Sequence, residues 1–134
     1  MSVQKLLEGK GASVPVIRSG LTLEDVINQM DIDKSAALVV TDNNQKILGI
    51  ITERDIARGF KMFGRNFVEK PLCDLMTTNV ITCDINQPLV TILELMDKYQ
   101  IQCVPITKDG LLCGIINMFD LVKYRLEEIE YEAK

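Results

Sequence analysis

The sequence contains no histidine, and it lacks long hydrophobic runs and an excess of positive charge. Without histidine, and with no serine or cysteine in a local nucleophile–base pattern, the residues do not support an enzyme. The formal net charge of −4 argues against the basic surface of a nucleic-acid-binding protein. No apolar run reaches the length of a membrane span, and residues 1–5 lack a signal-peptide core. We therefore expect a cytoplasmic, non-catalytic protein that binds neither nucleic acid nor membrane.

The four cysteines are too widely spaced for a structural zinc site, because Cys73, Cys83, Cys103 and Cys113 include no CxxC pair. Three of them lie among apolar neighbours, where a free cysteine behaves as a small hydrophobic residue. We expect buried, reduced thiols and no metal site. A disulfide between Cys103 and Cys113, which flank a predicted turn, is the alternative.

The most informative feature present is an internal repeat. The segment Gly-Ile-Ile-Thr-Glu-Arg-Asp-Ile at 49–56 returns as Gly-Ile-Ile-Asn-Met-Phe-Asp-Leu at 114–121, which is 65 residues later. Upstream, the apolar positions 23, 26, 27 and 30 return 66 residues later, at 89, 92, 93 and 96. A duplicated unit of this size rarely buries its apolar face alone. The 134 residues are therefore expected to form two half-domains that share a core and carry a pair of related sites.

Each copy is predicted to fold as β-α-β-β-α. Short β-branched runs at 14–17 and 80–83 are typical of strands. Helical spacing of apolar residues follows each of them, with Thr22 and Asp25 resembling a capping box and Pro88 suited to a first helical turn. Four short apolar runs then predict two buried hairpins, at 36–40 with 47–51 and at 101–106 with 111–116. A second helix begins near position 52 or 117.

The pattern also predicts the limits of the parts. They are a lead segment 1–13, a first repeat 14–67, a linker 68–79 with a short helix at 72–76, a second repeat 80–125 and a C-terminal helical tail 126–134. At the C-terminus, Val122, Leu126 and Ile129 continue an apolar stripe, which indicates a helix docked on its own protein or on a partner subunit.

The residues that point to chemistry lie where the third strand of each copy runs into a helix. The first N–H groups of a helix have no intrahelical partners and carry the positive end of its dipole, so they can hold a phosphate. There Thr52 can add a hydrogen bond to phosphate, Asp55 can accept two from a ribose diol, and Gly49 lets another group approach. The alternative is an ordinary helix cap that binds no ligand. Retention of Asp120 in the second copy favours the binding interpretation.

The β-α-β-β-α repeat, the pattern Gly-apolar-apolar-Thr-x-x-Asp and the Val-Pro-Ile of the second copy resemble a tandem pair of cystathionine-β-synthase (CBS) domains over residues 14–125. The segments 72–80 and 121–130 are similar to small stand-alone CBS-pair proteins. The resemblance implies an α/β fold in which two repeats form a pseudo-two-fold, Bateman-type module. It also implies a regulatory protein that binds an adenosine-containing ligand, such as AMP, ADP, ATP or NAD, in a cleft between the repeats, and that forms a homodimer through its helices.

Carried over residue by residue, the resemblance implies two sites. In the first, Thr52 faces phosphate and Asp55 faces ribose. Arg54 is the cation nearest to the phosphate position, and a solvated arginine on the helix face is the alternative. Its base slot would consist of Ile50, Val80, Ile81, Ile101 and Pro105. The second site would use Asn117 and Asp120, with a base slot formed by Val16, Ile17 and Ala37.

The sequence departs from the family pattern at the phosphate positions. Family members that bind phosphates tightly often carry Arg or His just before Val-Pro, where this chain has Gln102 and Cys103. Asn117 replaces Ser or Thr, and Phe119 crowds the second site. Because charge-assisted hydrogen bonds are roughly twice as strong as neutral ones, these changes predict weak phosphate binding and a tighter first site.

Two functions remain open at this stage. One is a ligand-sensing module with an adenine nucleotide as regulatory ligand and no cofactor, whose output passes to an unknown effector protein. The other is an interaction homodimer of the same fold with degenerate, unliganded clefts. Both hypotheses keep Asp55 and Asp120, so the sequence alone does not separate them.

Overall fold

The computed structural model describes residues 2–11 and 14–132, and these form two compact units. The first-repeat unit is Pro15–Val80. The second-repeat unit combines the residues before Pro15 with those from Ile81 onward, so the N-terminal segment belongs to the second repeat. Residues 68–79, the predicted linker, lie inside the first-repeat unit.

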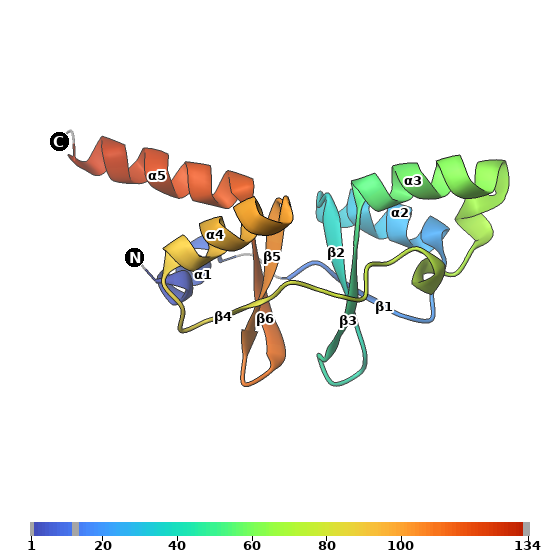
Figure 1. Ribbon diagram of the computed structural model, residues 1–134, viewed down its shortest axis with the longest axis horizontal. Coiled ribbons are helices and arrows are strands. Elements are labelled where there is room, and N and C mark those ends of the chain that lie inside the picture. The colour runs from blue at the N-terminus through green and yellow to red at the C-terminus, as the bar shows by residue number, and fades with distance from the viewer. Residues whose placement is uncertain (1, 12–13, 133–134) are drawn as a thin grey trace. The chain divides into compact units, whose positions relative to one another are not determined.

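The first-repeat unit is a three-stranded sheet with helices on one face (Figure 1). Its strands, in the order β1-β2-β3, are β1 (Val16–Arg18), β2 (Ala37–Thr41) and β3 (Ile47–Thr52). β1 pairs parallel to β2, and β3 pairs antiparallel to β2. Its helices are α2 (Leu23–Asp33), α3 (Glu53–Phe63) and the short 3₁₀ helices η1 (Gly64–Glu69) and η2 (Leu72–Asp74). The predicted β-α-β-β-α order and the hairpin are confirmed.

Helix α2 begins where the capping pattern predicts. The Thr22 hydroxyl accepts from the Asp25 N–H, and the Asp25 carboxylate accepts from the Thr22 N–H. Two N–H groups at the helix start are thereby satisfied. Its buried face, Leu23, Val26 and Met30, packs in a cluster with alternate strand residues and with Leu72 and Leu75 of the following segment. That segment therefore completes the core of the first-repeat unit.

The second-repeat unit repeats this plan and adds a helix before it. Its strands, in the order β4-β5-β6, are β4 (Cys83–Asp84), β5 (Cys103–Lys108) and β6 (Leu111–Asn117). Its helices are α1 (Val3–Lys10), α4 (Leu89–Tyr99) and α5 (Met118–Glu132). β4 is parallel and β6 antiparallel to β5, as in the first unit. Each hairpin also carries a register shift at the same repeat position, between Val40 and Thr41 or between Ile106 and Thr107.

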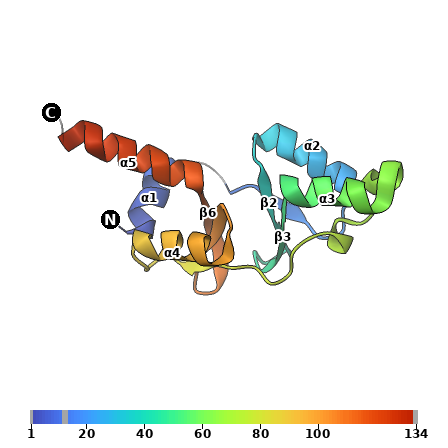
Figure 2. The same ribbon diagram turned by 45° about the horizontal axis from the view of Figure 1, so that its top comes forward.

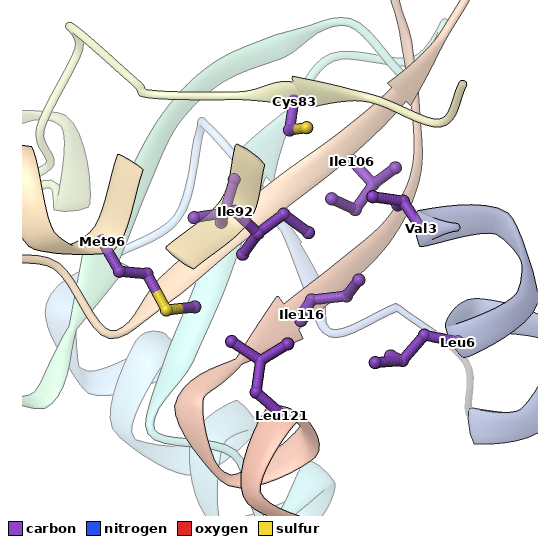
Figure 3. Packing of buried hydrophobic residues seen from close by; sticks show 9 residues of the cluster. Val3, Leu6, Cys83, Ile92, Met96, Ile106, Ile116 and Leu121 are labelled. Atoms are coloured by element: carbon purple, nitrogen blue, oxygen red, sulfur yellow. The ribbon is translucent and has the colours of Figure 1, made fainter. Parts of the chain in front are cut away.

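Helix α1 is part of the core of the second-repeat unit. Val3 and Leu6 are 0 % and 7 % exposed and point toward Ile106, Ile116 and Leu121 (Figure 3). The helix lies beside α4 and α5 (Figure 2). Each unit thus contains a cluster of buried hydrophobic residues of its own.

Several predicted boundaries are wrong by a few residues. The first strand of each repeat begins later than expected, at Val16 and Cys83, where the register with the neighbouring strand begins. Pro88, expected in the first helical turn, occupies the N-cap position instead, and α4 begins at Leu89. The predicted tail is continuous with α5 up to Glu132, and residues 133 and 134 lie outside the described part.

The cysteines are only partly as expected. Cys83 is buried, and burial, together with the nearby Asp84 carboxylate, raises the pKa of its thiol. Cys73 and Cys113 are exposed, so the prediction of buried thiols is wrong for these two. In the β5–β6 hairpin Cys103 lies opposite Asn117, four positions from Cys113, so the two do not face each other across the strands. Among the described residues, no helix is long and apolar enough to cross a membrane.

Candidate ligand-binding junctions

Each repeat contains a strand that passes into a helix with no loop between them. We define the first junction as the end of β3 at Thr52 with the start of α3, and the second junction as the end of β6 at Asn117 with the start of α5. These are the two places where the sequence predicts phosphate and ribose binding. Each junction lies wholly within one unit.

At the first junction, Thr52 and Asp55 form a complete capping box. The Thr52 N–H donates to Asp55 Oδ2 over 2.9 Å, and the Asp55 N–H donates to Thr52 Oγ1 over 3.4 Å. The Thr52 hydroxyl also donates its single hydrogen to Asp55 Oδ2, at 3.2 Å. Thr52 therefore has to rotate its hydroxyl away from Asp55 before it can donate to a phosphate.

The cap by itself does not mark a ligand site, because α2 has the same one. Thr22 and Asp25 make the same contacts as Thr52 and Asp55. Asp25 Oδ2 accepts from the Thr22 N–H at 2.9 Å and from the Thr22 hydroxyl at 3.0 Å, and the Asp25 N–H donates to Thr22 Oγ1 at 3.4 Å. The difference lies in the other carboxylate oxygen. Asp55 Oδ1 accepts from Arg58 Nη2 at 3.1 Å, and the same nitrogen donates to the Leu75 carbonyl at 3.1 Å. Asp55 is thus a buried carboxylate with a cation beside it.

The helix starts offer fewer N–H groups than the sequence suggested. The first N–H of α3, on Glu53, donates to the Ala36 carbonyl at 3.0 Å, and the third, on Asp55, donates to Thr52. The first N–H of α5, on Met118, donates likewise to the Gln102 carbonyl at 2.8 Å. Among the contacts of the described residues, the second N–H of each helix remains unused. A phosphate at either junction would find one backbone donor rather than several.

Gly49 does allow a close approach, but the approaching group belongs to the protein. A Cβ at Gly49 would lie 2.7 Å from Met76 Sδ and 2.9 Å from the Thr77 carbonyl oxygen. Thr77 also exchanges two hydrogen bonds of 2.9 Å with the backbone of Ile50. The segment that follows η2 therefore passes directly over the middle of β3, which explains the glycine without a ligand.

At the second junction, asparagine replaces threonine without loss of the cap. The Asn117 N–H donates to Asp120 Oδ2 at 2.9 Å, and the Asp120 N–H donates to Asn117 Oδ1 at 2.8 Å. The cap uses only the amide oxygen, so the Nδ2 group of Asn117 remains a donor beside the helix start. Phe119, which was expected to crowd this site, has a side chain that is 72 % exposed.

A cation from the far end of the sequence completes the second junction. Lys10 Nζ donates to Asp120 Oδ2 and to the Ile115 carbonyl oxygen, both at 2.8 Å. The pair is partly buried, with 22 % of the Lys10 side chain and 14 % of the Asp120 side chain exposed. Lys10 is not among the residues predicted from the sequence, because 110 positions separate it from Asp120. At the first junction Arg58, one turn after Asp55, contacts the carboxylate, and it was likewise not among the predicted residues.

The other predicted site residues are distributed over both units. Ile50, Val80, Val16, Ile17 and Ala37 belong to the first-repeat unit, and Ile81, Ile101 and Pro105 to the second. Ile17 is a member of the first-repeat core, and Ile101 packs against the core of its own unit. Val16, which precedes Ile17 on β1, is exposed. The structure therefore gathers Thr52, Asp55 and Ile50 at one junction and Asn117 with Asp120 at the other.

Comparison with known proteins decides the family. The CBS domain description matches residues 12–61 and 72–127, which is most of the chain and covers both repeats. The chain belongs to the CBS domain family. The CBS fold is shared by the CBS-domain protein ATU1752 from Agrobacterium tumefaciens, which is 31 % identical with a TM-score of 0.88 over 93 % of this chain and 99 % of that one. The predicted α/β fold of two CBS repeats is confirmed.

Two further proteins are similar to this chain. The CBS pair of protein MJ0100, solved in complex with 5′-methylthioadenosine and S-adenosyl-L-methionine, has a TM-score of 0.84 at 24 % identity over 96 % of this chain and 98 % of that one. Arabinose 5-phosphate isomerase KdsD of Francisella tularensis is 28 % identical over 87 % of this chain. The chain spans 36 %, 21 % and 20 % of the length of the first three curated relatives.

Proposed function

We propose that this CBS pair is a regulatory, non-catalytic module that senses an adenosine-containing ligand of the AMP, ADP, ATP or NAD type at its two strand–helix junctions. The observation that carries the proposal is the pair of enclosed carboxylates, Asp55 and Asp120, each at the third position of a helix and each beside a cation. The complex recorded for MJ0100 with two adenosine compounds supports the ligand class.

The lone pairs of the carboxylates suit a ribose diol. Asp120 uses only Oδ2 for its contacts with described residues, so Oδ1 remains an acceptor for ribose hydroxyls. Asp55 uses both oxygens, but its Oδ1 partner Arg58 has a side chain that is 51 % exposed. Because Arg58 is half-exposed, a ribose hydroxyl can compete with it for Asp55 Oδ1. One helix N–H at each junction is left for a phosphate oxygen.

The ligand class is tested by calorimetry of the full chain with AMP, ATP, NAD, NADH and S-adenosylmethionine. We expect at least one adenosine compound to bind, and Asp55→Ala to weaken it by about 1.5–3 kcal/mol, the contribution of hydrogen bonds to a charged group. Independently, a ligand at 100 times its Kd should raise the free energy of unfolding of the wild type by ~2.7 kcal/mol in a thermal-shift series.

Asp25→Ala is the matched control, because it removes the same type of cap from α2 at a position where no ligand is proposed. Both substitutions should cost a similar amount of stability, whereas only Asp55→Ala should change the affinity. Unchanged affinity in a folded Asp55→Ala protein would remove Asp55 from the site. Equal weakening by both variants would show that the effect is structural.

We also propose that the chain forms a homodimer through its helices, which would pass the ligand state to an effector protein. The supporting observation is α5, where Val122, Leu126 and Ile129 lie at i, i+4 and i+7 and are 49 %, 61 % and 46 % exposed. Such a stripe on one helix face is typical of a buried contact. Two copies of one patch make an isologous interface, the commonest way to close an oligomer.

Light scattering at micromolar concentration, with and without ligand, tests the homodimer. We expect twice the mass of the chain, and Leu126→Asp should produce monomer because it places a charge in the stripe. Lys123→Gln is the control, since it also lowers the net charge by one on the same helix but leaves the stripe intact. A monomeric wild type under both conditions would exclude the homodimer and leave the ligand site as a separate question.

A further inference from the structure

Helix α1 lies outside the residues that match the CBS family, yet it is built into the second-repeat unit. Val3 and Leu6 are buried in the core, and Leu7 lies against Gly114, where a Cβ would be 2.7 Å from the leucine side chain. Gly11 ends the helix in the left-handed conformation, with φ of 62°. This anchoring places Lys10, in the last turn of α1, at the second junction.

The two junctions obtain their cations from different parts of the chain. Arg58 lies one turn after Asp55, and its repeat equivalent, 65 residues on, is Lys123. The cation that contacts Asp120 is instead Lys10. The Lys10 side chain is less than half as exposed as that of Arg58, so solvent screens the charge of Lys10 less. Two of the three N–H groups of its ammonium are used, and the third remains a donor.

We propose that Lys10 is a specificity-determining residue that makes the second junction prefer a phosphate-bearing adenosine ligand over uncharged adenosine. The proposal rests on the proposed function. With Lys10 in place, the Asp120 carboxylate is neutralised, and a phosphate meets the spare ammonium N–H and the unused helix N–H. Without Lys10, the same phosphate meets an uncompensated carboxylate in a chain whose formal net charge is already −4.

The selectivity is measured as the ratio of AMP affinity to adenosine affinity. Both ligands carry the same ribose and base, so any effect of Lys10 on the diol site cancels in the ratio. Calorimetry is done in the Asp55→Ala background, which weakens the first junction. Lys10→Met should lower the ratio by about tenfold, from loss of one charge-assisted hydrogen bond. Lys10→Arg, which keeps the charge, should restore most of it.

Lys5→Met is the matched control, because Lys5 is an exposed lysine on the same helix and the charge change is identical. Hydrogen exchange of residues 3–10 checks that α1 stays docked in each variant, and Lys10→Gln replaces Lys10→Met if the latter loosens the helix. Three outcomes would overturn the role of Lys10 but leave the proposed function standing. They are an unchanged affinity ratio in Lys10→Met, an equal fall of the ratio in Lys5→Met, and no binding in the Asp55→Ala background while the wild type binds. Failure of the wild type to bind any adenosine compound would overturn the proposed function with it.

Discussion

Alanine at both Val3 and Leu6 is expected to lower the free energy of unfolding by about 3–6 kcal/mol, since full burial of each such side chain stabilises by roughly 1.5–3 kcal/mol. Both side chains lie in the core of the second-repeat unit, next to Ile106 and Ile116. Urea unfolding followed by circular dichroism measures the change. The loss is large relative to the typical 5–15 kcal/mol of a folded domain.

Lys5→Ala with Glu8→Ala is the control, because both residues are exposed on α1 and alanine is a good helix former. The urea midpoint of this control should be close to that of the wild type. If the variant with alanine at Val3 and Leu6 also unfolded at the wild-type urea concentration, α1 would be a peripheral lead segment. Lys10 would then have no fixed place beside Asp120.

Gly49→Ala is expected to destabilise the first-repeat unit by about 1–3 kcal/mol, the usual cost of overpacking. The new methyl group would lie 2.9 Å from the Thr77 carbonyl oxygen, which is backbone and is held by hydrogen bonds to Ile50. Displacing it means breaking that pairing. Met76 Sδ, at 2.7 Å, can move more easily because it ends a flexible side chain.

The repeat equivalent, Gly114→Ala, is the built-in comparison. There the methyl group would meet only side-chain atoms of Leu7, at 2.7, 2.8 and 3.3 Å, and these can adjust. Urea midpoints of the two variants should show the larger loss at Gly49. Equal losses, or stabilisation of the kind that glycine-to-alanine changes bring where there is room, would contradict the close passage of Thr77 over β3.

Local features were predictable because the interacting residues are close in sequence. The capping boxes join residues three apart, as in Thr22 with Asp25, so a motif suffices to find them. Arg58 was within reach of the same reasoning, since it follows Asp55 by one helical turn. Arg54, expected from the family resemblance as the cation nearest to phosphate, stays a prediction.

The sequence by itself determined that this protein is built from two β-α-β-β-α repeats, with a carboxylate one turn into the second helix of each, because periodicity and capping act over a few residues. Only the tertiary structure decided which groups meet those elements. It placed Thr77 over Gly49 and Lys10 on Asp120, and it made α1 part of the second core. These contacts join residues at least 28 positions apart, and they form because buried apolar residues such as Val3 and Leu72 must pack against other parts of the chain. A local sequence pattern does not indicate which distant residues these side chains contact.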